Sequence, residues 1–196
     1  MRTADITRKT RETDIRLMLN LDPGESGVPV VSIDTGIGFF DHMLTAFAVH
    51  SGLELNVTVK GDLSVDCHHT IEDTGIALGA ALGQALGDRR GITRFADCKV
   101  PMDEALAECA LDIGGRAYLH FDAEFTNPSV GGYDCCMTEE FFRAVAMGAG
   151  LTLHLCVPYG KNDHHKIEAL YKAFARALRT AVRVTGTEIP STKGML

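Results

Sequence analysis

The stretch HHTIEDTGIALGAAL, residues 68–82, recurs as HHKIEALYKAFARAL at residues 164–178, and the two align without gaps at an offset of 96. The copies share both histidines, the isoleucine and glutamate that follow, and three further apolar positions. Chance similarity between two amphipathic helices explains shared alanines and leucines, but it does not explain the motif HHxxE twice. The repeat therefore indicates that the chain arose by duplication.

Each copy of this motif begins the last helix of a half with the same order of elements: strand, strand, helix, strand, helix. In the first half, apolar spacing predicts strands over 14–22 and 28–34, a helix over 38–52, a strand over 53–60 and a helix from His69 to Leu86. The second half gives strands over 104–113 and 116–125, a helix from about Thr138 to Ala149, a strand over 151–157 and a helix from about His164 to Arg183.

These two halves predict an α+β fold, a duplicated split β-α-β arrangement (ββαβα twice) related by a pseudo-two-fold axis. We expect the sheets to pack against the helices, with sheets on one side and helices on the other. The first repeat covers residues 1–92, and the second covers 93–196 with a C-terminal substrate-binding tail. Short repeats rarely bury their apolar faces alone, so we expect one compact unit.

The composition is that of a globular protein. Of 196 residues, 45% are hydrophobic and 23% are charged. The sequence shows neither an apolar run of the roughly 20 residues that a membrane span needs nor the apolar core of a signal peptide. These features predict a cytoplasmic protein with no membrane partner.

Charge and cysteine usage narrow the function further. The formal net charge of -7 argues against a nucleic-acid partner, because phosphate backbones attract basic surfaces. The cysteines form no CxxC pair, which favours reduced thiols over disulfides or a zinc site. They are Cys67, Cys98, Cys109, Cys135, Cys136 and Cys156.

The duplicated motif has the spacing of a metal site. Residues four apart share a helix face, so His68 with Glu72, and His164 with Glu168, can each chelate one ion. Adjacent residues point about 100° apart, so the two histidines of a pair cannot comfortably bind one metal. Two metals at similar sites are the simplest interpretation. The alternative is that these are solvated residues at a helix start, which is harder to defend for two copies.

Imidazole and carboxylate ligands together suit Mn, Fe, Zn or Ni better than Ca or Mg. At an offset of 98, DHMLTAFA aligns with EEFFRAVA and places His42 opposite Glu140, so each is predicted to complete one metal sphere. A surface carboxylate is the alternative for Glu140. Three other histidines have no duplicated partner and are predicted to be packed or hydrogen-bonded residues: His50, His120 and His154.

Cationic residues outside the apolar pattern suggest an anionic substrate. Arg116 follows two glycines, and Lys193 lies in the tail STKG, which is rich in phosphate donors. Arg94 is a third such cation. Each alone is more typical of a solvated surface charge. The tail is not a P-loop, because the spaced preceding glycine is missing.

With these residues in view, the chain resembles imidazoleglycerol-phosphate dehydratase, a family of histidine biosynthesis. The resemblance runs over essentially the whole length. It rests on RKTRET, GIGFFDHML, DCHHTIEDTGIALG, DIGGR, GKNDHHKIEALYKAFARAL and IPSTKG, which occur in family order.

This resemblance implies a metal-dependent carbon–oxygen lyase that dehydrates D-erythro-imidazole-glycerol phosphate to imidazole-acetol phosphate. It also implies two Mn²⁺ per active site and a cytoplasmic homo-oligomer, a 24-mer, with active sites between subunits. The residues that match metal ligands are His42, His68, His69, Glu72, Glu140, His164, His165 and Glu168. Glu140 departs from the histidine of some family members, which makes that site richer in oxygen. The residues that match substrate contacts are Glu12, Arg94, Arg116, Lys172, Ser191 and Lys193.

The chemistry fits these residues, because two metals that hold the imidazole as imidazolate let the ring push electrons toward the departing hydroxyl. Glu12 is the candidate acid/base. The predicted catalytic set is Glu12, His42, His68, Glu72, His164 and Glu168. Two rival functions remain open at this point: a di-metal hydrolase of a small phosphorylated substrate, and a metal-binding assembly protein.

Overall fold

Two four-stranded sheets with the same connectivity confirm the duplicated fold. The computed structural model describes residues 1–23 and 29–196, so the start of the strand predicted over 28–34 lies outside the described residues. The strand orders are β1-β2-β4-β3 and β5-β6-β10-β7. In each sheet the last strand pairs in parallel with its neighbour, β3 with β4 and β7 with β10, across one helix.

The elements of the first repeat are β1 (Thr3–Lys9), β2 (Thr13–Asn20), β3 (Val31–Asp34), α1 (Gly38–Ser51), β4 (Glu54–Gly61) and α2 (His68–Leu86). Those of the second are β5 (Phe95–Met102), β6 (Ala105–Asp112), β7 (Tyr118–Asp122), α3 (Met137–Ala149), β10 (Thr152–Tyr159) and α4 (Asp163–Ala181). A short hairpin precedes α3 and consists of β8 (Ser129–Val130) and β9 (Tyr133–Asp134).

The predicted order ββαβα lacks one strand of each four-stranded sheet, and it also lacks the short β8-β9 hairpin. The additional strands, β1 and β5, lie at the sheet edges and pair only with β2 and β6. Only Ala4 is buried in β1 and only Val100 in β5. With one buried side chain each, these edge strands carry little of the apolar alternation from which strands are predicted. In β2, by contrast, Ile15, Leu17 and Leu19 are all buried.

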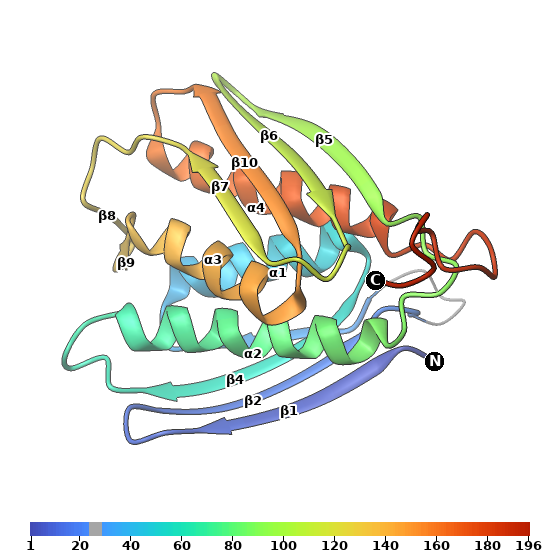
Figure 1. Cartoon of the computed structure of the whole chain (residues 1–196). Coiled ribbons are helices and arrows are strands. Elements are labelled where there is room, and N and C mark those ends of the chain that lie inside the picture. The colour runs from blue at the N-terminus through green and yellow to red at the C-terminus, as the bar shows by residue number, and fades with distance from the viewer. Residues whose placement is uncertain (24–28) are drawn as a thin grey trace.

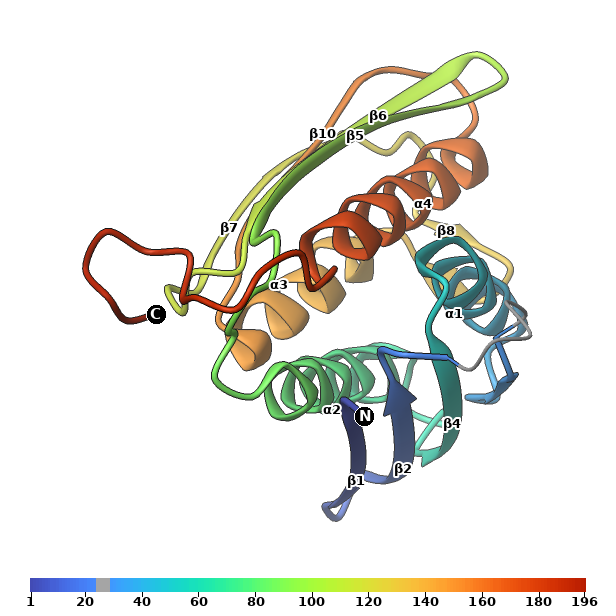
Figure 2. The same cartoon turned by 90° about the vertical axis from the view of Figure 1, so that its right-hand side faces the viewer.

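The layers also differ from the expectation of sheets on one side and helices on the other. The four helices lie between the two sheets, which form the outer layers (Figures 1 and 2). Helix α2 covers β1 and β2, while α4 covers β5 and β6. Each sheet buries its single apolar face on helices of its own repeat, and the helices then pack across the repeats. Helix α2 contacts α3, and α1 contacts α4.

Small residues bring α2 and α3 into close contact. A Cβ at Gly79 would lie 2.8 Å from the Val145 carbonyl oxygen and 2.9 Å from the Gly148 Cα. A Cβ at Gly75 would lie 2.8 Å from the carbonyl oxygen of Phe141. The glycines of α2 therefore serve backbone packing, as their spacing of four predicts, and they fix α2 against α3 directly behind the duplicated motif.

An aromatic core joins the two repeats. Phe47 of α1 stacks on Phe174 of α4 at 5.5 Å between ring centroids, and Phe141 of α3 stacks on Tyr171 of α4 at 5.1 Å. All four rings are fully buried. Aromatic pairs contribute about 0.5–1.5 kcal/mol beyond the area they bury, so the bundle holds its helix ends in fixed positions.

Two sequence expectations can be compared directly with the structure. All six cysteines are free thiols, which agrees with the prediction of reduced cysteines. Within the described residues, no helix combines the length and apolar character that a bilayer span requires.

Candidate metal centres and an anion pocket

The first cluster brings together His42 of α1 with His164 and Glu168 of α4. The Nε2 atoms of His42 and His164 lie 3.4 Å and 3.1 Å from the Oε2 atom of Glu168. One ligand atom from each residue lies within 4.8 Å of the other two. His42 belongs to one repeat and the HHxxE motif to the other, so packing of α1 on α4 creates a group that neither repeat contains alone.

Glu168 is the most enclosed member of the first cluster, at 6% exposure. Burial alone would raise the pKa of Glu168, but the hydrogen bond and charge of Lys172 and the charge of His42 outweigh it and lower the pKa. Lys172 binds the Oε1 atom at 2.7 Å and leaves Oε2 to the histidines. The carboxylate is therefore charged at neutral pH, as a metal ligand must be.

The second cluster is the pseudo-symmetric counterpart on α2. The Nε2 atom of His68 lies 3.3 Å from the Oε2 atom of Glu72. Glu140 lies on the facing helix α3, at the position that corresponds to His42. Its carboxylate is 3.6 Å from the Nε atom of Arg143. Among the residues that the structure describes, Glu140 does not form a compact three-residue group with His68 and Glu72. Ligation by Glu140 stays a prediction.

The second histidine of each motif turns away from the first, as the helix geometry predicts. The rings of His68 and His69 are inclined by 73°, and those of His164 and His165 by 77°. The Nδ1 atom of His69 lies 3.0 Å from a carboxylate oxygen of Asp62, and its Nε2 atom lies 3.7 Å from the Oε1 atom of Glu12. Mainly through the hydrogen bond with Asp62, the pKa of His69 is raised.

His165 is held in a similar way from the hairpin between β5 and β6. Its Nδ1 atom lies 2.8 Å from the Oε2 atom of Glu104. Backbone N–H groups of Asn162 and Lys161 and the His165 ring lower the pKa of Glu104 to about 2. A carboxylate on Nδ1 leaves Nε2 for a metal, which is the usual outer contact of a ligating histidine. Sequence reasoning missed both Asp62 and Glu104.

The carboxylates Glu12 and Glu104 occupy equivalent places in the two repeats. Each immediately precedes the second strand of its hairpin, β2 or β6, and each faces the second histidine of its own repeat. They face different ring nitrogens, however, since Glu12 lies nearest Nε2 of His69 and Glu104 binds Nδ1 of His165. Of the two, only Glu12 is placed where a ligand on Nε2 would meet it.

We expect Glu104→Gln to weaken divalent-metal binding at His165 by roughly 10- to 100-fold, because loss of a carboxylate behind a ligating histidine typically has this effect. Titration of metal-free protein with Mn²⁺, followed by the electron paramagnetic resonance signal of the free ion, measures the change. Glu108→Gln is the matched control, because Glu108 follows in β6 and pairs with Lys99 rather than with a motif histidine. Equal affinity in both variants would contradict the role of Glu104.

The start of α4 is fixed by buried polar contacts. The side chain of Asn162 accepts a hydrogen bond from the N–H of His164 and caps the helix. Asp163 is buried, pairs with Lys166 at 2.9 Å and accepts the N–H of Asn127 at 2.7 Å. Burial alone would raise the pKa of Asp163, and the bonds from Lys166 and Asn127 outweigh it, so the pKa is lowered. The motif histidines thus project from a rigid helix end.

Four predicted substrate residues meet in a pocket of about 820 Å³. They are Arg94, Arg116, Ser191 and Lys193. Arg89 also lines the pocket, and sequence reasoning missed it because the pair Arg89 and Arg90 in the turn after α2 matches no motif. The other two predicted substrate residues lie elsewhere: Lys172 pairs with Glu168 of the first cluster, and Glu12 is near His69.

The arginines of this pocket differ in their contacts. Arg94 is buried, makes a bidentate pair with Asp112 at 2.6 Å and 3.1 Å, and donates to the carbonyl oxygen of Pro190 at 2.7 Å. Its guanidinium orders the C-terminal tail. The side chain of Arg116 is 70% exposed and lies 3.6 Å from the same aspartate, so it is the freer cation for an anion.

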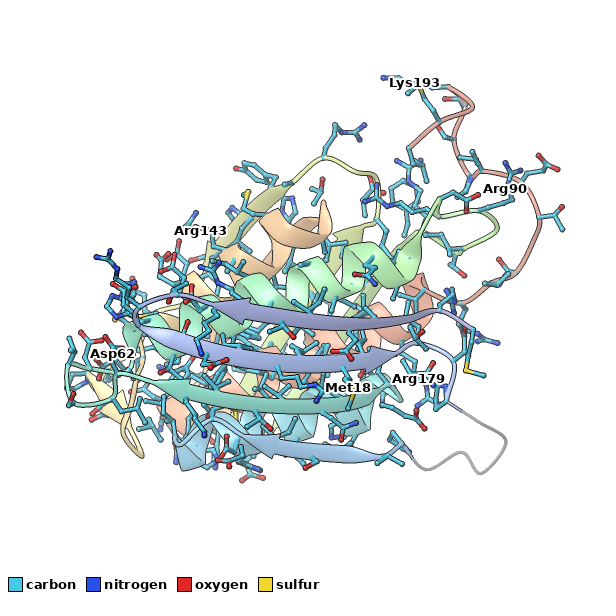
Figure 3. The ribbon with its side chains drawn as sticks, turned by 90° about the horizontal axis from the view of Figure 1, so that it is seen from below. Met18, Asp62, Arg90, Arg143, Arg179 and Lys193 are labelled. Atoms are coloured by element: carbon cyan, nitrogen blue, oxygen red, sulfur yellow. The ribbon has the colours of Figure 1, made fainter. Side chains whose placement is uncertain are left out.

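The clusters and the pocket lie at opposite ends of helices α2 and α4. His68 begins the 19-residue helix α2, and Arg89 follows its end. His164 lies at the start of α4, and the N–H of Arg94 donates to the carbonyl of Ala181 at the end of that helix. Helices of this length span about 27 Å. Figure 3 shows Asp62 and Arg143 toward one end and Lys193 and Arg90 at the other.

Known proteins of one family are similar to this chain over most or all of its length. The family model described as imidazoleglycerol-phosphate dehydratase matches residues 35–178. A relative of that name from Methanosarcina barkeri is 55% identical over 196 residues, and another from Lacticaseibacillus casei is 57% identical over 198 residues. Both comparisons cover 100% of this chain and 100% of the relative.

Two solved structures share the fold. The crystal structure of imidazoleglycerol-phosphate dehydratase from Staphylococcus aureus has a TM-score of 0.84 at 40% identity and covers 93% of this chain and 99% of that one. The enzyme from Pyrococcus furiosus has a TM-score of 0.84 at 35% identity, covering 97% and 100%.

Proposed function

The chain belongs to the imidazoleglycerol-phosphate dehydratase family. From this premise we propose which part of the substrate binds at the metal clusters and which part binds in the anion pocket. The protein is a carbon–oxygen lyase of histidine biosynthesis, which removes water from imidazole-glycerol phosphate. We assign the metal clusters to the imidazole end of the substrate and the arginine-lined pocket to its phosphate. The first cluster carries this proposal, because two imidazoles and a buried charged carboxylate converge there.

The donor set fits a divalent transition metal such as Mn²⁺. His42, His164 and Glu168 would hold one ion, and His68 with Glu72 would supply ligands to a second. His69 and His165 are partly exposed and have Nδ1 bound to carboxylates, which suits ligands to an ion shared with another copy. When bound, the two metals would stabilise the deprotonated imidazole ring and so favour departure of the hydroxyl.

Within the pocket, Arg116, Ser191 and Lys193 would bind the phosphate. Exposed guanidinium and ammonium groups make charge-assisted hydrogen bonds to phosphate, and the hydroxyl of Ser191 adds a donor. Arg94 would act mainly through the tail, because its guanidinium already binds Asp112 and Pro190. Binding the phosphate at a fixed place orients the three-carbon chain toward the metal ligands.

We propose active sites between copies of the chain, in a homo-oligomer that we take to be a 24-mer. One substrate molecule with a three-carbon chain cannot bridge the roughly 27 Å that separates the clusters from the pocket along α2 and α4. A complete site therefore needs the metal end of one copy and the pocket of another. The free thiols of all six cysteines support a cytoplasmic location.

Glu12 is assigned as the acid/base that moves the proton of the carbon next to the departing hydroxyl. Its carboxylate is about half exposed and lies 3.7 Å from the Nε2 atom of His69, so it borders the place of a ligand on that nitrogen. We expect Glu12→Gln to lower kcat by roughly 100- to 10,000-fold with unchanged metal content, the range of general acid–base catalysis. Near-normal kcat in the metal-loaded variant would rule out this role.

Metal removal combined with an assay on imidazole-glycerol phosphate tests the function as a whole. We expect the chelated protein to lose turnover and to fall to smaller species in light scattering, and Mn²⁺ to restore both, because ligands from neighbouring copies would lose their shared ion. The product should be a ketone that retains its phosphate. Release of inorganic phosphate would instead identify a hydrolase, and an unchanged size after chelation would count against metals that bridge copies.

A further inference from the structure

A second group of metal-binding side chains lies on the outer face of the β5-β6-β10-β7 sheet. His120 and Asp122 belong to β7, and Cys156 belongs to the neighbouring parallel strand β10. Their ligand atoms, one from each residue, lie within 4.8 Å of one another. The opposite face of this sheet packs on α4, so the group is separated from the HHxxE clusters by the sheet itself.

Strand register accounts for this convergence. Cys156 lies directly opposite Asp122, and His120 precedes Asp122 by two residues, so all three point to the same face. His154 lies opposite His120 in the same register, with 5.2 Å between the two ring centroids. The pairing of β10 with β6 becomes irregular after Cys156, a feature that typically re-aims side chains.

We propose that His120, Asp122 and Cys156 bind a divalent thiophilic cation of the zinc class. Imidazole, carboxylate and thiolate are the three ligand types of zinc sites, and three protein ligands leave one position open. The group is not a lone thiol beside acidic residues, because the imidazole of His120 is one of its three members. A concave surface of about 200 Å³ adjoins it and includes His154 and Cys156.

The local charges favour a cation over the free thiol. Partial burial raises the pKa of the Cys156 thiol, and the carboxylates of Asp122 and Glu108 raise it further. A cation between the thiol and these carboxylates relieves that repulsion. On binding, the S–H bond breaks, the proton passes to solvent, and a sulfur–metal bond forms without oxidation or reduction.

Ligand type separates this site from the proposed catalytic metals. Thiolate selects Zn²⁺ and Co²⁺ over Mn²⁺, whereas the HHxxE clusters offer imidazole and carboxylate. The outer site should therefore fill with zinc or cobalt while Mn²⁺ remains at the clusters. Sequence reasoning assigned His120 and His154 to packing or hydrogen bonding, because nothing in the spacing of 120, 122 and 156 reveals that the two strands are neighbours.

Co²⁺ titration of the assembled, Mn²⁺-loaded protein tests the proposal, because a cobalt–thiolate bond gives a near-ultraviolet charge-transfer band. We expect one equivalent of this band per chain in the wild type, complete loss in Cys156→Ser, and roughly tenfold or greater weakening of Co²⁺ binding in His120→Ala and Asp122→Asn. Cys136→Ser, which removes an exposed thiol outside this sheet, is the matched control and should keep the band.

Three results would overturn the proposal: no thiolate band at saturating Co²⁺, a band that survives in Cys156→Ser, or a band lost in Cys98→Ser instead. Dehydratase activity of Cys156→Ser should stay at the wild-type level. That measurement confirms that the variant folds and keeps this test independent of the proposed reaction.

Discussion

Replacing Glu168 with glutamine is expected to lower kcat at least about 1,000-fold, measured by steady-state assay with metal content determined on the same sample. The Oε2 atom of Glu168 faces the Nε2 atoms of both His42 and His164, so this carboxylate is the centre of the first cluster. Glutamine keeps the shape but removes the negative charge that a divalent ion needs. A metal supplies several kcal/mol of charge stabilisation, and about 4 kcal/mol correspond to 1,000-fold.

Glu139→Gln is the control for this substitution. Glu139 is also a helical glutamate that pairs with a cation, Arg143, but it belongs to neither cluster. It should retain full activity and metal content. Near-normal turnover in Glu168→Gln would show that the first cluster is not needed for the reaction. Inactivity with full metal content would move the role of Glu168 from metal binding to another step.

The duplicated motif allowed the fold to be predicted well in its helices and inner strands. HHxxE at an offset of 96 identified α2 and α4 as equivalent, and the apolar alternation of β2, β4, β6 and β10 was strong enough to predict these strands. Strands β1 and β5 were not predicted because each buries only one side chain and so lacks the apolar alternation of the inner strands. The order of the layers was not predicted, because apolar periodicity shows which face of an element is buried but not which element covers it.

Only the parts of the candidate site that lie within one helix could be predicted from the sequence. Helix periodicity pairs His68 with Glu72 and separates it from His69, and the structure agrees with both. Periodicity cannot show that His42 meets the motif of the other repeat, since this depends on the packing of α1 on α4. Asp62 and Glu104 could not be predicted either, because each lies outside the helix whose histidine it contacts.

The two halves depart from pseudo-symmetry at two of the proposed site positions. His42 is matched by Glu140, and if Glu140 is a ligand, as we propose, that metal site would be richer in oxygen than the first. Glu12 and Glu104 occupy equivalent hairpin positions but approach different nitrogens of their histidines. These contacts are consistent with the proposed roles, in which Glu104 on Nδ1 would orient a ligating histidine and Glu12 near Nε2 would exchange a proton with the substrate.

Hybrid assemblies of two inactive variants should regain activity. One variant carries Glu168→Gln at the metal end, and the other carries Arg116→Ala with Lys193→Ala in the anion pocket. Loss of two charge-assisted contacts, each contributing about 1.5–3 kcal/mol, should reduce kcat/KM of the second variant by at least about 100-fold. Co-expression with two different tags and purification on both yields assemblies that contain both chains, and the steady-state assay gives their kcat.

If each active site combines the metal end of one copy with the pocket of another, random mixing leaves about a quarter of the sites free of either lesion. The hybrid should then show about a quarter of wild-type kcat with a wild-type KM. A site within one chain gives a different result, because every chain in the hybrid carries a lesion and activity would stay at the level of the separate variants. The length of α4, about 27 Å, argues for recovery, because His164 lies at its start and Arg94 contacts its end, and a small substrate cannot span that distance within one chain.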